Sequence, residues 1–147
     1  MDNINLYTIG FTKKNAETFF SLLKRNNVRK LIDVRLNNVS QLAGFTKQED
    51  LKYFLRELCN IDYYHFEQFA PTEEILKRYK KKEISWKEYE EEFISLISKR
   101  QIEKLVSLDL LSDACLLCSE STAENCHRRL VAEYFSRMFP QIRIIHI

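Results

Sequence analysis

Short apolar runs alternate with longer amphipathic segments along this chain, and that alternation constrains its fold more than any other feature. Residues 4–9, 29–34, 61–66, 114–119 and 141–147 are typical of strands. Helical spacing of apolar side chains marks residues 15–26, 101–111 and 125–139, and three further helices that begin at Thr46, Thr72 and Ser85. Strands that alternate with helices favour a mainly parallel sheet covered on both faces. We therefore expect an α/β fold, a single three-layer α/β/α domain over residues 1–147 with about five strands.

The composition agrees with this expectation. A chain of 147 residues suits one domain, and only two glycines and two prolines occur. A β-sandwich or barrel needs more turn residues than that. Basic and acidic residues nearly balance, 23 against 21, which disfavours a protein whose whole surface holds nucleic acid and leaves that partner weakly supported.

The N-terminal residues show neither a basic start nor an apolar signal core, and the apolar run 114–118 is too short to span a membrane. We expect a cytoplasmic protein with no membrane partner and with its four cysteines reduced. No glycine-rich phosphate loop is visible, so no cofactor is expected, and the sequence does not indicate an oligomeric state.

Polar residues gather where the predicted strands end. Gly10 and Thr12 follow the first strand, Asp33 and Arg35 close the second, and residues 118–120 close the fourth. In parallel sheets, ligand sites form outside the carboxyl ends of the strands. We expect these residues to share a site. Asp33 and Arg35 either bind substrate there or pair with each other and with Arg128 as a structural network.

The segment from Cys118 to Arg129 carries the strongest signal. Asn125 is a good N-cap, which would place Cys126, His127 and Arg128 in the first turn of the last helix. Cations there oppose the helix dipole by about 0.3–1 kcal/mol each where exposed. Something anionic relieves the conflict: a bound phosphate or carboxylate, or the protein's own carboxylates. The alternative is that the arginines point outward and pair with Glu124 or Glu133.

A thiol beside His127 and Arg128 at a helix start is a candidate nucleophile, because its thiolate is favoured there. In that hypothesis His127 orients Cys126 or acts as acid and base, while Glu120 serves as a general acid or holds the cations. The alternative is that Cys126 is a small buried apolar residue.

Metal binding is a rival interpretation, since Cys115, Cys118, Cys126 and His127 are four potential ligands. Side chains three apart on a strand point to opposite faces, so Cys115 and Cys118 cannot share a zinc site. We therefore expect no metal. A redox pair of Cys118 and Cys126 also remains open.

The motifs together resemble the family called domain of unknown function 488, along nearly the whole chain. They are residues 8–10 (Thr-Ile-Gly), residues 33–35 (Asp-Val-Arg), Ser40, Cys118-x-Glu120, Cys126-His127-Arg128, residues 70–72 (Ala-Pro-Thr), and residues 84–86 (Ile-Ser-Trp) with Tyr89. The resemblance implies a three-layer α/β fold and no settled activity.

Two positions depart from the pattern of that family. Many members carry His-Ser where Phe11 and Thr12 stand here, so any role of that histidine is absent or reassigned. Asn38 stands where proline is frequent. The residues 33–35 also resemble a strand ending of rhodanese-type sulfurtransferases, but we interpret that as shared architecture.

Our leading hypothesis is a small enzyme that acts on an anionic substrate, such as a nucleotide or a nucleic-acid component. The candidate catalytic residues are Cys126, Glu120, His127 and Asp33. The candidate substrate-binding residues are Gly10, Thr12, Arg35, Ser40, Cys118, Arg128 and Arg129. The alternatives are a non-catalytic binding module in which the same cluster is structural, and a nucleic-acid binder.

Overall fold

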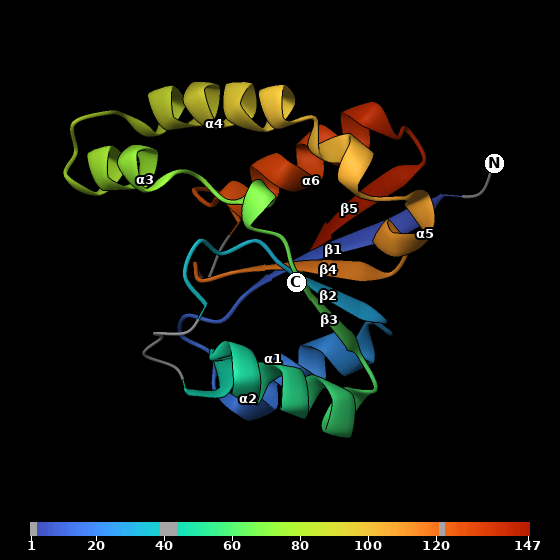
Figure 1. The fold of residues 1–147 in the computed structure, drawn as a ribbon. Helices are drawn as coiled ribbons and strands as arrows, with labels where there is room; N and C mark the ends of the chain where they lie inside the picture. The colour runs from blue at the N-terminus through green and yellow to red at the C-terminus, as the bar shows by residue number, and fades with distance from the viewer. Residues whose placement is uncertain (1–2, 39–43, 121–122) are drawn as a thin grey trace.

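The computed structural model describes residues 3–38, 44–120 and 123–147. Within them, five strands form one parallel sheet in the order β3-β2-β4-β1-β5 (Figure 1). The strands are β1 (Ile4–Gly10), β2 (Lys30–Asp33), β3 (Asp62–His65), β4 (Ala114–Cys118) and β5 (Ile142–His146). Every neighbouring pair is parallel, which confirms the predicted α/β class.

Helices cover both faces of the sheet (Figure 1). The α-helices are α1 (Ala16–Arg25), α2 (Gln48–Phe54), α3 (Glu73–Lys80), α4 (Trp86–Arg100), α5 (Leu108–Leu111) and α6 (His127–Met138). Helices α1 and α2 lie on one face, whereas α3, α4 and α6 lie on the other. Short 3₁₀ turns cover Gly44–Thr46, Glu67–Phe69 and Ile102–Leu105, and a π-helical turn, Leu55–Cys59, extends α2.

Three predicted helix starts are confirmed by their caps. Asn15 accepts the backbone N–H of Thr18 at 2.8 Å, and Thr72 accepts that of Ile75 at 3.2 Å. Ser85 forms a complete capping box, which fixes where α4 begins.

Two local predictions are wrong. Thr46 does not cap a helix, because it is buried in a 3₁₀ turn and α2 begins after Lys47. The helical signal over residues 101–111 is broken at Val106, whose backbone is extended, and Ser107 caps the new helix α5. In both places tertiary packing outweighs the local sequence pattern from which the helix was predicted.

The sheet divides the interior into two cores. Cys115, Leu117 and Ile9 face α1 and α2, whereas Leu116 and Cys118 face the layer that holds α4 and α6. Among the described residues, no helix combines the length and apolar character needed to cross a membrane. The register aligns the carboxyl ends of the central strands, since Gly10 lies opposite Cys118 and Asp33 opposite Leu117.

Candidate functional site

A cavity of about 420 Å³ opens at the carboxyl ends of the strands, between the sheet and the α3–α4–α6 layer. Its size suits a small molecule. Four segments line it: the loop after β2, the hairpin of α3 and α4, the end of β4 and the start of α6. The lining residues are Arg35, Leu36, Asn37, Pro71, Leu76, Tyr79, Lys80, Trp86, Tyr89, Cys118, Ser119, Glu120, Asn125, Cys126 and His127.

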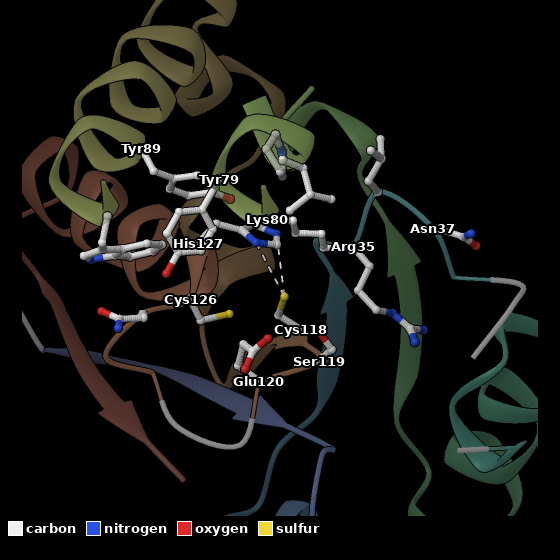
Figure 2. Close-up of a pocket in the computed structure, with 15 residues that line it drawn as sticks. Arg35, Asn37, Tyr79, Lys80, Tyr89, Cys118, Ser119, Glu120, Cys126 and His127 are labelled. Carbon is white, nitrogen blue, oxygen red and sulfur yellow. Dashed lines mark hydrogen bonds between the residues drawn. The ribbon is translucent and has the colours of Figure 1, made fainter. Parts of the chain in front are cut away.

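Two thiols and one imidazole meet in the wall of this cavity (Figure 2). Cys118 ends β4, and Cys126 and His127 begin α6; all three are buried. The sulfur of Cys118 lies 3.5 Å from Nδ1 of His127. One ligand atom from each of the three residues falls within 4.8 Å of the others. The end of a strand and the start of the following helix therefore converge on one point.

The ring of His127 is held in one orientation. Nε2 lies 2.7 Å from the backbone carbonyl oxygen of Val34, which can only accept, so Nε2 carries the proton. Phe93 of α4 packs against the ring edge-to-face with centroids 5.5 Å apart. The lone pair of Nδ1 is thereby directed to the side where Cys118 lies.

The start of α6 differs from the sequence prediction. Cys126, not Asn125, is the N-cap, and the helix begins at His127. The backbone N–H of Cys126 donates to Ala123 and its carbonyl accepts from Arg129, so a turn over residues 123–126 takes the place of the first predicted helical residues. Cys126 consequently flanks the helix instead of lying in its first turn.

The two thiols differ in acidity. A hydrogen bond from Cys126 lowers the pKa of Cys118, helped by the backbone of Ser119 and the charge of Arg128, while burial opposes the change. The same contact with Cys118, together with burial, raises the pKa of Cys126. Cys118 is therefore the more acidic thiol of the pair, whereas the sequence directed attention to Cys126.

Asp33 and Arg35 are engaged with each other. Arg35 donates from Nε and Nη2 to the carboxylate of Asp33 at 2.9 and 2.8 Å, and from Nη2 to the Thr46 carbonyl at 2.7 Å. The Tyr63 hydroxyl donates to Asp33 at 2.5 Å. Asp33 is fully buried and does not line the cavity. Figure 2 shows the guanidinium of Arg35 directed away from the thiols. Arg35 therefore lines the cavity with the other atoms of the residue and not with its charged group.

Arg128 and Gly10 lie behind the cavity wall. Arg128 is 1% exposed and donates from Nη1 to the backbone carbonyl of Glu120 at 2.7 Å. A Cβ on Gly10 would meet that same carbonyl oxygen. Both residues hold the loop after β4 in place, while the side chain of Glu120 faces the cavity.

The remaining predicted residues lie elsewhere. Arg129 pairs with Glu90 at 2.6 Å and with Glu133 at 3.6 Å. The alternative considered from the sequence named Glu133 but not Glu90. Thr12 is exposed and absent from the cavity wall. Ser40 lies outside the described residues.

Cys115 points to the opposite side of the sheet from Cys118, as strand geometry predicts. That placement excludes a site made of all four predicted ligands. It leaves Cys118, Cys126 and His127 as a group of three potential ligands.

An aromatic wall was missed by sequence reasoning. Trp86 stacks on Tyr89 with centroids 4.8 Å apart, Tyr79 tilts against both, and all three line the cavity beside Lys80. No binding role was predicted for any of these four residues from the sequence. The signal available in the sequence was the family motif at residues 84–86 and Tyr89, which carried no assigned role.

Comparisons with known proteins agree with the motifs. Neither the curated proteins nor the solved structures contain a match. The family model described as domain of unknown function DUF488 matches residues 15–135, which include β2, β4 and most of α6. Because that match covers most of the chain, the protein belongs to the DUF488 family.

Proposed function

We propose that this protein is a small enzyme that acts on a phosphate-bearing ligand of the nucleotide class, bound in the cavity at the carboxyl ends of the strands. One observation carries the proposal: two thiols, an imidazole and the carboxylate of Glu120 share a small-molecule cavity with an aromatic wall and a lysine. Reactive groups, a flat apolar surface and a cation are the parts that such a ligand requires.

The aromatic wall supports a planar ligand. Trp86 and Tyr89 stack at an interplanar angle of 17°, and Tyr79 lies at 59° to Trp86. Aromatic faces accept a nucleobase by stacking, with little dependence on which base it is. The three aromatic residues line the same cavity as Cys118, so a bound base would leave the rest of the ligand near that thiol.

The anionic part of the ligand is assigned to Lys80 and to the start of α6. No side chain caps the first turn of that helix, and the turn contains no acidic residue, so its N–H groups and dipole favour an anion. Arg35 and Arg128 are not needed for this role, because their guanidinium groups bind Asp33, the Thr46 carbonyl and the Glu120 carbonyl.

The test uses the single tryptophan of the chain, Trp86, as a fluorescent reporter inside the cavity. Nucleoside monophosphates and diphosphates should change its emission saturably, and the matching nucleosides should bind less tightly. Lys80→Ala should weaken nucleotide binding about tenfold, equal to about 1.4 kcal/mol. Lys81→Ala is the matched control, since Lys81 follows α3 and does not line the cavity.

Turnover is assayed separately, by chromatography of the nucleotides after incubation. Cys118→Ser should retain binding and lose product formation. Unchanged Trp86 emission across the whole panel, or equal binding of nucleosides and nucleotides, would contradict the proposal.

A second candidate is a non-catalytic binding module. The burial of Arg35 and Arg128 in internal hydrogen bonds favours it. Arg35 joins the end of β2 to the Thr46 turn, and Arg128 joins α6 to the loop after β4, instead of contacting a ligand. It predicts saturable binding by the Trp86 assay with no product from any bound nucleotide, in the wild type as in Cys118→Ser.

A further inference from the structure

We propose that Cys118, Cys126 and His127 bind one divalent metal ion of the zinc type, with a free coordination position that faces the cavity. The proposal concerns the three-ligand group that remains once Cys115 is excluded. It does not depend on the proposed function, because metal binding is measured without any substrate.

The distances fit a tetrahedral ion. Zinc binds thiolate sulfur at about 2.3 Å and imidazole nitrogen at about 2.0–2.1 Å, so two such ligands on one tetrahedral ion lie roughly 3.6 Å apart. The sulfur of Cys118 and Nδ1 of His127 lie 3.5 Å apart. All three ligand atoms are within 4.8 Å of one another, so small side-chain rotations complete the site.

The imidazole is already oriented as a metal ligand. Metal-bound histidines nearly always donate their second ring N–H to a carbonyl or carboxylate, which fixes the ring and makes the other nitrogen more basic. His127 makes that bond from Nε2 to the Val34 carbonyl at 2.7 Å, and Phe93 packs against the ring. Nδ1 is left to coordinate on the side of the two sulfurs.

The ligand types select the ion. Two thiolates and one imidazole suit zinc, whereas magnesium and calcium prefer oxygen ligands. Two thiolates also cancel the charge of a divalent ion, so the loaded site adds no net charge to a buried position.

Three protein ligands leave one position open, which is the arrangement of catalytic zinc and not of structural zinc. Cys118, Cys126 and His127 all line the cavity, and Glu120 lines it without belonging to the ligand group. A water in the open position would give a proton to Glu120. The resulting hydroxide would form a bond to the electrophilic atom of the ligand as the bond to the leaving group breaks, and that group would take the proton from Glu120. This step alone rests on the proposed function, and it makes the reaction a hydrolysis.

Cobalt(II) titration tests the site directly, because cobalt reports thiolate ligands and tetrahedral geometry in its absorption spectrum. The reduced, chelator-treated full chain is titrated anaerobically. One equivalent should give a thiolate-to-cobalt charge-transfer band and intense visible bands, and zinc should abolish both by displacement. Binding should release protons, since the thiols must ionise.

Variants assign the ligands. Cys118→Ser, Cys126→Ser and His127→Gln should each weaken cobalt binding at least tenfold and change the spectrum. Cys59→Ser and Cys115→Ala are matched controls that should keep one equivalent, because neither thiol belongs to the group. Circular dichroism on every variant shows that it folds, and only folded variants are compared.

Three results would overturn the proposal: no charge-transfer band in the wild type, an unchanged spectrum in folded Cys118→Ser, or equal loss in the Cys115→Ala control. If cobalt binds as expected while the Trp86 assay shows no nucleotide binding, the metal site stands and the proposed function fails. Nucleotide turnover by metal-free protein that chelators do not slow would contradict the hydrolytic step and leave the proposed function standing.

Discussion

The backbone of Glu120 lies directly against the α-carbon of Gly10, so that a Cβ there would stand 1.5 Å from the Glu120 carbonyl oxygen. That oxygen accepts the hydrogen bond from Arg128. Three segments far apart in the chain, the end of β1, the loop after β4 and the start of α6, are thus joined at one carbonyl. The position of Glu120 in the cavity depends on this contact.

Gly10→Ala should destabilise the protein, because its methyl group meets backbone atoms that cannot rotate away. We expect a loss of about 1–3 kcal/mol of unfolding free energy, typical of overpacking a buried site. Gly44→Ala is the control, since a Cβ there meets no atom within 4 Å, and it should change stability by less than about 0.5 kcal/mol. Urea denaturation measures both; equal stability of the two variants would show that the Glu120 carbonyl moves freely.

Neighbouring arginines should differ sharply in their effect on stability. Arg128→Ala removes the largest of the fully buried side chains and its bond to the Glu120 carbonyl, so we expect a loss of about 2–4 kcal/mol. Arg129→Ala breaks partly exposed pairs with Glu90 and Glu133 and should cost less than about 1 kcal/mol. Thermal and urea unfolding of the two variants measure this difference, and similar losses of stability would contradict the prediction.

Asp33→Asn should destabilise the protein strongly, although Asp33 does not line the cavity. The carboxylate is fully buried and accepts two hydrogen bonds from the guanidinium of Arg35, so its neutralisation leaves an uncompensated buried cation. We expect a loss of about 3–5 kcal/mol. Asp62→Asn, an exposed residue on the adjacent strand β3, serves as the control. If Asp33→Asn unfolds like the wild type but loses turnover, Asp33 has the catalytic role that its strand-end position first suggested.

His146 should make the protein sensitive to mild acid. Burial and the charge of Arg128 lower the pKa of His146 from 6.5, and its Nδ1 lies 2.6 Å from the Thr8 hydroxyl. As pH falls through 6.5, His146 gains a proton in the unfolded chain before it does so in the folded protein, so the unfolding free energy falls. His146→Gln should flatten the decline between about pH 7 and pH 5. Parallel stability curves for variant and wild type would refute this.

The residues of the cavity show how far sequence reasoning reaches. Four residues that line the cavity were predicted as site residues: Cys118, Glu120, Cys126 and His127. Their prediction was possible because ligand sites in parallel sheets form where a strand ends and the next helix begins. Arg35 and Arg128 were expected to bind substrate, yet Arg35 binds Asp33 and the Thr46 carbonyl, and Arg128 binds the Glu120 carbonyl. The pairing of Arg35 with Asp33 was an alternative open from the sequence, whereas no local pattern predicts the two backbone carbonyls.

The α/β alternation, the caps at Asn15, Thr72 and Ser85, and the opposite faces of Cys115 and Cys118 could all be predicted from the sequence. Each of these depends on periods and hydrogen bonds within a few residues. The position of β4 between β2 and β1 could not be predicted and is seen only in the fold. It brings the Val34 carbonyl to His127 and the Glu120 carbonyl to Gly10. The segment from Cys118 to Arg129 carries the thiols and the imidazole, but their roles depend on long-range contacts. The groups that the fold places beside a buried ring set its orientation, and those beside a buried thiol set its protonation.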